Sequence, residues 1–152
     1  YMTFCASSKM PGLKKFFDAR KINSYIENNC ITVSRAAFKN GSVYHLYVHD
    51  DKNTVILYSA SDFRNKDVDS NLAGRANKFL HYKDMTYFKA HGLRSYDWGN
   101  ISSPIEPNGV DNFKIAFGGE KTAVYNIFLG NSLSGKILVS IRKYIAYKRR
   151  GK

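Results

Sequence analysis

The chain has 152 residues, with 24 Lys or Arg against 12 Asp or Glu, so its formal net charge is +12, and 43% of its residues are hydrophobic. A length close to about 150 residues predicts one compact domain over 1–152, or a segment of a longer chain, with enough apolar surface to build one core. Eleven Tyr and ten Phe beside only three Pro exclude a disordered chain, and the lack of any run of about 18 apolar residues excludes a transmembrane helix.

The first half of the chain predicts a helix followed by a β-meander. Residues 12–28 carry apolar side chains at roughly helical spacing and predict one or two helical segments. Three β-rich runs follow at 31–38, 42–50 and 54–62, separated by short Asn-Gly and Asp-rich loops. Loops of this composition are typical of hairpins, so we expect the three strands to be antiparallel.

The second half alternates helices with strands. The expected elements are helix 71–91 with Gly92 as its C-terminal stop, strand 94–98, helix 110–117, strand 121–129 and helix 131–150. The whole chain therefore runs α–βββ–α–β–α–β–α. This order predicts an α/β protein of the α+β kind, in which helices flank a mixed, mostly antiparallel central sheet.

Cysteine usage and the N-terminal residues predict a cytoplasmic location. Cys5 and Cys30 form no Cys-x-x-Cys pair, which indicates free thiols in a reducing compartment. The start YMTFCASSKMPG lacks the basic, apolar and small-residue regions of a secretory signal. The excess positive charge is expected to attract a polyanion, which leaves open nucleic acid, anionic lipid and a phosphorylated ligand.

A candidate phosphate site lies where the meander leads into the long helix. The segment FRNKDVDSNLAGRA, residues 63–76, places Gly74 and Ala76 in the first turns of that helix, beside the cationic Arg75. Helix N-termini bind phosphate because their backbone N–H groups and dipole favour anions. The alternative interpretation is that these small residues only allow the helix to pack closely against the sheet.

Three sequence words resemble a known family. They are Asn71-x-x-Gly74-x-Ala76, continued by Gly74 to Tyr82 (GRANKFLHY), then Tyr96 to Ile101 (YDWGNI) and Phe113 to Glu120 (FKIAFGGE). In this order they resemble the C-terminal half of Fem-type proteins and their short relatives in the GNAT superfamily of N-acyltransferases. Two positions depart from the family words: Asn100 stands where a second Gly is usual, and Tyr82 stands where Trp is usual.

The resemblance implies an acyl-CoA N-acyltransferase fold with a V-shaped cleft between its fourth and fifth strands. It implies acyl-CoA as the donor, or an aminoacyl-tRNA as in Fem-type members, and an amine of a lipid-linked cell-envelope saccharide or peptide precursor as the acceptor. The activity would belong to polysaccharide biosynthesis. The donor phosphates would bind around the first turns of the long helix, at Asn71, Gly74, Arg75, Ala76 and Asn77.

Acyl transfer to an amine needs a group that takes a proton from the nucleophile and an acid for the leaving group. Asp97, at a strand end, and His81, in the long helix, are the candidates for the first role. Tyr125, in the last predicted strand, is a candidate for the second. Each also has a structural interpretation: Asp97 as a loop carboxylate bonding backbone N–H groups, and His81 as a packed helix residue.

Lys114 lies off the apolar face of its short helix and is a candidate for phosphate or acceptor binding, together with Tyr96 and Trp98 as substrate-binding residues. His45 and His49 fall on one face of a strand, along with Tyr47. Two histidines without a third ligand do not specify zinc, so no metal is predicted.

The C-terminal helix carries an apolar stripe and a basic flank. Three interpretations stay open: a core-facing helix with solvated charges, peripheral contact with an anionic membrane, and a grip on an RNA backbone such as that of tRNA. The alternative to an enzyme is therefore a non-catalytic module on an inactive GNAT-like scaffold that binds nucleic acid or another surface.

Overall fold

The computed structural model describes residues 18–103, 105–125 and 127–150, the last five of these by their backbone alone. The chain divides into two compact units, Tyr1–Lys114 and Ile115–Lys152. That residues 1–152 form a single domain stays a prediction. The predicted helix residues 12–17 and Cys5 lie outside the described residues, and Cys30 has a free thiol.

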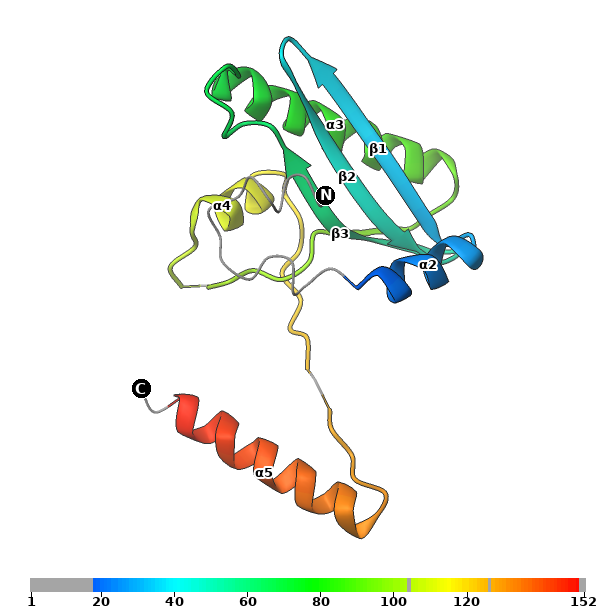
Figure 1. The fold of residues 1–152 in the computed structure, drawn as a ribbon, viewed down its shortest axis with the longest axis vertical. Helices are drawn as coiled ribbons and strands as arrows, with labels where there is room; N and C mark the ends of the chain where they lie inside the picture. The colour runs from blue at the N-terminus through cyan, green and yellow to red at the C-terminus, as the bar shows by residue number, and fades with distance from the viewer. Residues whose placement is uncertain (1–17, 104, 126, 151–152) are drawn as a thin grey trace. The chain divides into compact units, whose positions relative to one another are not determined.

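The first unit is built on a mixed sheet with the strand order β1-β2-β3-β4 (Figure 1). The strands are β1 (Ile31–Phe38), β2 (Gly41–His49), β3 (Asn53–Ser61) and β4 (Ser95–Asp97). β1 with β2 and β2 with β3 are antiparallel, whereas β3 with β4 is parallel. This confirms the α+β class and the predicted meander, including its first hairpin, where Asn40 takes a φ of 63° before Gly41.

Helix α3 (Ser70–Ala90) covers one face of this sheet (Figure 1). Its buried residues are spaced by one, three, four or seven positions, which places them on a single stripe: Ala73, Leu80, His81, Asp84 and Phe88. Opposite this stripe, Val43, His45 and Tyr47 of β2 are fully buried, as expected for alternate residues of one strand face. The core of the first unit is therefore the layer between α3 and β2.

Local capping signals set both ends of α3. The Asp69 carboxylate accepts hydrogen bonds from the backbone N–H groups of Asn71 and Leu72 at the start. At the other end Gly92 adopts a φ of +84°, which glycine takes at little cost, and the N–H of Leu93 donates to the carbonyl of Phe88. The predicted helix 71–91 and its Gly92 stop are confirmed.

β3 and β4 share only a short parallel pairing. Asn53, Thr54 and Val55 pair with residues 95–97, after which β4 ends while β3 continues to Ser61. The pairing of β2 with β3 also shifts register: Leu46 pairs with Tyr58, whereas Tyr47 pairs with Ile56. This shift marks a β-bulge in β3. The residues of β3 after Val55 therefore lie beyond the end of β4.

Two shorter helices complete the elements around the sheet. α2 (Ala19–Glu27) begins at Asp18, whose carboxylate accepts the N–H of Arg20. α4 (Gly109–Ile115) holds the loop before it through Asp111, which accepts hydrogen bonds from both the hydroxyl and the N–H of Ser102. These hydrogen bonds, above all the one from the Ser102 hydroxyl, lower the pKa of Asp111 to about 2. Asp111 therefore stays ionised at neutral pH and continues to accept them.

The second unit contains α5 (Leu133–Arg150), which starts after Ser132, whose hydroxyl accepts the N–H of Gly135. The predicted strand 121–129 is wrong: in the described residues of this segment, which leave out 126, no strand forms. β-rich composition stabilises a strand only when a neighbouring strand and an apolar surface cover it. The described part of the second unit contains no such strand.

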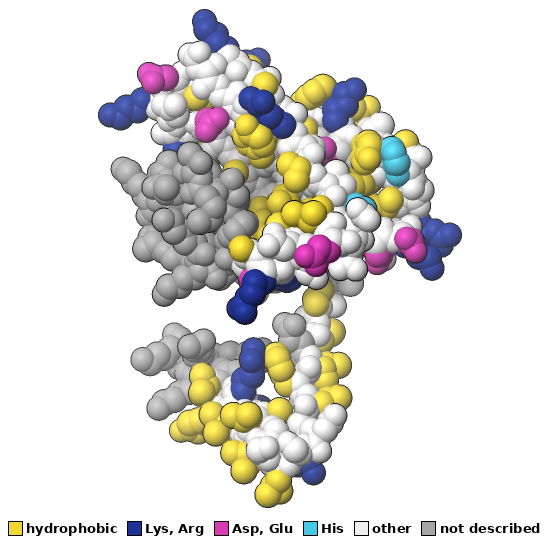
Figure 2. All heavy atoms as spheres, turned by 45° about the vertical axis from the view of Figure 1, so that its right-hand side comes forward, with side chains coloured by type: hydrophobic (Ala, Val, Ile, Leu, Met, Phe, Trp, Pro, Cys, Tyr) yellow, Lys and Arg dark blue, Asp and Glu magenta, His cyan; other side chains and the backbone are white. Residues whose placement is uncertain are grey.

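Large apolar side chains of the second unit are exposed, and Figure 2 shows hydrophobic side chains gathered on its visible face. The described apolar side chains of the α5 stripe are exposed, and the core-facing interpretation of this helix stays a prediction. Contact with a membrane surface or with RNA stays a prediction. The exposed members are Val124, Tyr125, Ile127, Phe128, Leu129, Leu133, Ile137, Leu138, Ile141, Tyr144 and Ile145.

Candidate functional site

A pocket of about 570 Å³ opens in the first unit beside the part of β3 that runs past the pairing with β4. This volume lies in the range of about 300–1,000 Å³ typical of small-molecule sites. β3, the start of α3, the residue after β4 and the short helix α4 each contribute to its lining. The lining residues are Ile56, Leu57, Tyr58, Ser59, Ser61, Phe63, Ser70, Ala73, Gly74, Asn77, His81, Trp98, Gly109, Val110, Phe113 and Lys114.

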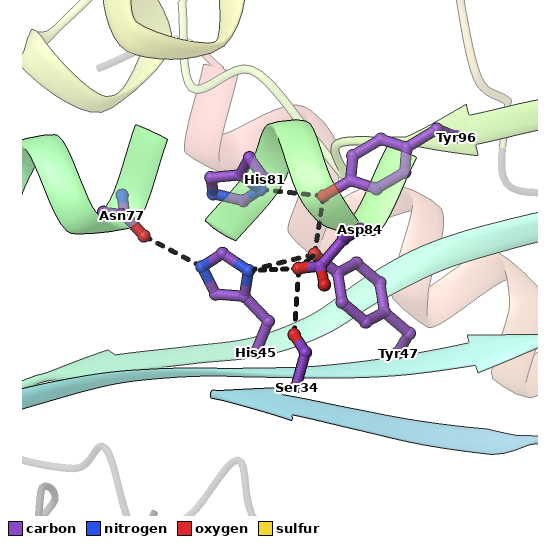
Figure 3. A network of polar contacts seen from close by, with 7 residues as sticks. All are labelled: Ser34, His45, Tyr47, Asn77, His81, Asp84 and Tyr96. Atoms are coloured by element: carbon purple, nitrogen blue, oxygen red, sulfur yellow. Dashed lines mark hydrogen bonds and ion pairs between the residues drawn. The ribbon is translucent and has the colours of Figure 1, made fainter. Parts of the chain in front are cut away.

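A buried polar network centred on Asp84 of α3 (Figure 3) adjoins the pocket, because Asn77 and His81 belong to both. Its Oδ2 accepts a hydrogen bond from the Ser34 hydroxyl at 2.9 Å, one from Nδ1 of His45 at 2.8 Å and one from the Tyr47 hydroxyl at 2.6 Å. Carboxylates are stable in a protein interior only when several donors replace their water. Strands β1 and β2 supply these three donors.

Two phenols connect this carboxylate to His81. The hydroxyls of Tyr47 and Tyr96 are 2.7 Å apart, and the Tyr96 hydroxyl lies 2.8 Å from Nδ1 of His81 (Figure 3). Burial raises the pKa of both tyrosines well above the ordinary value. Both phenols therefore keep their hydrogens at neutral pH and act as hydrogen-bonding groups.

His81 is a neutral imidazole at the wall of the pocket. Its side chain is 3% exposed, and this burial, followed by the nearby His45, lowers the pKa of His81 to about 3. The rings of His45 and His81 lie 3.9 Å apart at 30°, and the rings of Trp98 and Phe113 lie 4.5 and 5.5 Å from His81. The His81 ring is thus unprotonated, in an aromatic surrounding, at pH 7.

His45 is held at both ring nitrogens. Nδ1 faces Asp84, and Nε2 lies 2.8 Å from the side-chain oxygen of Asn77. A ring that donates at both positions is an imidazolium, whereas a neutral ring accepts at Nε2 from the Asn77 amide once that amide is turned round. Among the described residues, no buried side-chain nitrogen or oxygen lacks a hydrogen-bond partner. A fully satisfied network of this kind keeps its members in place.

The low pKa of His81 predicts a pH dependence of stability. In the folded state His81 titrates near 3 and in the unfolded chain near 6.5, so between these values the unfolded state binds the additional proton. Stability therefore rises with pH across this window; its full contribution is present above pH 6.5 and is lost as pH falls towards 3. Urea unfolding from pH 7.5 to 4.5 should give a steeper loss for the wild type than for His81→Gln, and parallel curves would contradict this assignment.

The structure brings several of the predicted site residues together. His81, Trp98 and Lys114 line one pocket, and Tyr96 lies behind it through its hydrogen bond to His81. The ammonium group of Lys114 donates to the carbonyl of Asn100 at 2.8 Å, so this side chain contacts the loop that follows β4. Of the predicted phosphate-binding residues, Gly74 and Asn77 also line the pocket.

Other predicted residues lie elsewhere. Asp97 is exposed, and its carboxylate accepts the N–H of Gly99 at 2.7 Å, which is its structural interpretation. Tyr125 belongs to the second unit and is 81% exposed. The described lining of the pocket does not include Asn71, Arg75 or Ala76. Their proposed roles stay predictions.

Sequence reasoning missed Asp84, Tyr47 and Ser34 as members of a network. A usable signal was present: Asn77, His81 and Asp84 follow one another at steps of four and three, which puts all three on one face of a helix. Polar residues of this kind on the face that covers a sheet need buried partners. The alternating His45 and Tyr47 on β2 are those partners.

No metal centre accompanies the network in the part of the chain that the structure describes, because no group of three or more His, Cys, Asp or Glu is arranged to hold a metal ion there. None of the helices formed by the described residues is both long and apolar enough to cross a membrane. Comparison of the chain with family models, curated proteins and solved structures finds no match.

Proposed function

We propose that this protein is an N-acyltransferase that moves an acyl group from a phosphorylated donor, an acyl-CoA, to an amine of a cell-envelope saccharide or peptide precursor. The observation that carries the proposal is a pocket of small-molecule size beside the part of β3 that runs past its parallel pairing with β4, walled by the neutral imidazole of His81. The words that resemble GNAT and Fem-type proteins fall on α3, on β4 with its following loop and on α4, which are elements around this pocket.

The chemistry needs a base beside the attacking amine. The amine nitrogen attacks the carbonyl carbon of the thioester, the carbon–sulfur bond breaks, and the thiolate leaves with the electron pair of that bond. His81 takes the proton from the nitrogen and returns it to the thiolate, so the atoms and charges balance. The His81 imidazole is unprotonated at pH 7, the state that a proton acceptor needs.

The pocket suits the acyl and thioester arm of a donor better than its phosphates. Its lining is rich in aromatic and small side chains, with Lys114 as its cation. At the start of α3, however, the Asp69 carboxylate already accepts the N–H groups of Asn71 and Leu72 and adds a negative charge there. Donor phosphates near this turn therefore need cations such as Lys114 or Arg75 to outweigh Asp69.

A ligand titration tests the proposal and its alternative, a nucleic-acid-binding module. Acetyl-CoA or desulfo-CoA should raise the melting temperature even at raised salt, since a ligand at a hundred times its Kd stabilises by about 2.7 kcal/mol. Bulk tRNA is measured at the same two salt concentrations. A shift with tRNA alone, abolished by salt, would point to backbone contacts and against acyl-CoA. No shift with any of these would remove the basis of the proposal.

Gly74 offers a matched pair of variants for the pocket. A Cβ placed on Gly74 has nothing within 4 Å, and the residue lines the pocket. Gly74→Phe should therefore fold normally and lose acetyl-CoA binding. Gly74→Ala should bind as the wild type does and gain about 0.5–1 kcal/mol in the free energy of unfolding, because alanine is the better helix residue. Unchanged binding by Gly74→Phe would mean that the donor occupies another surface.

A further inference from the structure

We propose that Tyr96 and Tyr47 are positioning residues that hold His81 as the tautomer with its hydrogen on Nδ1, which leaves Nε2 as the nitrogen that takes the proton. The role of Nε2 in acyl transfer rests on the proposed function. The tautomer itself does not, because it follows from the direction of the hydrogen bonds that run from Asp84 to His81.

The direction follows from counting hydrogens. A carboxylate only accepts, so the single hydroxyl hydrogen of Tyr47 points to Asp84 at 2.6 Å. The oxygen of Tyr47 must then accept at its two other contacts, with Nδ1 of His45 at 3.0 Å and with the Tyr96 hydroxyl at 2.7 Å, which makes Tyr96 the donor in the second. Because Tyr96 donates its only hydroxyl hydrogen to Tyr47, its oxygen accepts at the 2.8 Å contact with Nδ1 of His81. His81 therefore carries a hydrogen on Nδ1.

The surroundings keep this direction in place. Tyr47 and His45 are both 0% exposed, so water does not compete for these bonds from within the layer between α3 and β2. The other donors to Asp84, Ser34 and Nδ1 of His45, keep its oxygen an acceptor. The rings also hold one another: Tyr47 and Tyr96 lie 5.6 Å apart, and Tyr96 and His81 lie 6.3 Å apart at 81°.

The relay has a consequence for the reaction. Once Nε2 of His81 accepts a proton, the imidazolium still donates from Nδ1 to Tyr96, and the chain of aligned hydroxyls ends at the Asp84 carboxylate. The negative end of the relay then stabilises the positive ring, as an orienting carboxylate does for a catalytic histidine. In this protein two phenols separate the carboxylate from the histidine.

The test reads the tautomer directly. The protein contains four histidines, and nitrogen-15 labelling with long-range proton–nitrogen NMR at pH 7.5 distinguishes a protonated from an unprotonated ring nitrogen in each. The His81→Gln spectrum, which lacks one ring, identifies the His81 signals. We expect the wild type to carry its hydrogen on Nδ1 of His81. A hydrogen on Nε2 in the wild type would overturn the proposal.

Tyr96→Phe removes the acceptor at Nδ1 and should move the hydrogen of His81 wholly or partly to Nε2. It should also lower kcat by about tenfold or more with little change in KM for the donor. Tyr82→Phe is the matched control, because Tyr82 adjoins His81 on α3 but is 60% exposed. An unchanged His81 tautomer in Tyr96→Phe would overturn the relay, whatever the activity.

The two proposals can fail separately. If the tautomer shifts in Tyr96→Phe but the wild-type protein transfers no acyl group, the positioning role of Tyr96 is supported and the acyltransferase function is contradicted. If the wild type transfers acyl groups and the tautomer does not respond, the acyltransferase stands and the relay falls. Should Tyr96→Phe fail to fold, Tyr47→Phe replaces it. This variant removes the hydroxyl between Asp84 and Tyr96, and its spectrum is compared with that of the wild type.

Discussion

In an acyl-transfer assay that follows release of the free thiol, His81→Gln is expected to turn over about 100- to 10,000-fold more slowly than the wild type, the usual contribution of a positioned general base. Glutamine occupies a similar space but takes no proton near pH 7. The pocket lined by β3, α4 and Trp98 remains, so on the proposed function acetyl-CoA should still raise the melting temperature. The loss should therefore appear in kcat rather than in donor binding.

His91→Gln is the matched control for this experiment. His91 follows α3, is exposed and bonds locally to the carbonyl of Tyr87, so this variant should keep wild-type turnover. Asp97→Ala tests the competing candidate in the same assay. Full activity in His81→Gln together with a large loss in Asp97→Ala would transfer the role of the base to Asp97 and contradict the assignment made here.

Asp84→Ala is expected to lower the free energy of unfolding by about 3–5 kcal/mol, the range found when one partner of a buried charged network is removed. The Ser34 hydroxyl, Nδ1 of His45 and the Tyr47 hydroxyl would all lose their common acceptor within the core. Each buried donor left without a partner costs about 1–3 kcal/mol. Urea unfolding measured by circular dichroism at pH 7.5 gives the difference.

Two comparisons make the Asp84 result interpretable. Asp84→Asn retains the size and one acceptor oxygen, so we expect a smaller loss than for alanine. Asp97→Ala removes an exposed carboxylate with a single backbone bond and should cost less than about 1 kcal/mol. If Asp84→Ala were no less stable than Asp97→Ala, the network would not be a structural centre of the fold.

Most of the secondary structure of the first unit was predictable, because local signals specify it. The turn at Asn40 and Gly41 set the first hairpin, and β1 begins and ends at the predicted residues 31–38. Asp69 and Gly92 bound α3 within one residue of the expected limits. Capping, turn chemistry and periodicity act over a few residues, so they can be read without the tertiary structure.

The strand expected over 121–129 shows where such signals fail. Its apolar residues, among them Val124, Ile127 and Leu129, favour a strand, yet these three are more than three-quarters exposed and belong to no strand. A strand is stabilised by a neighbour that pairs with it and by the surface it covers, neither of which is encoded in the segment. The same limit applies to α5, whose apolar stripe identifies a helix but not what covers it.

By itself the sequence determined the class of the fold, the bounds of its main helices and strands, and the presence of His81, Tyr96, Trp98 and Lys114 as groups worth examining. Only the tertiary structure decided which of them act together. Asp84 is 39 positions from His45, and Tyr47 is 49 positions from Tyr96. Their contacts depend on strand register and on how α3 lies across the sheet, and a shift of one residue in β2 would turn His45 and Tyr47 to the other face.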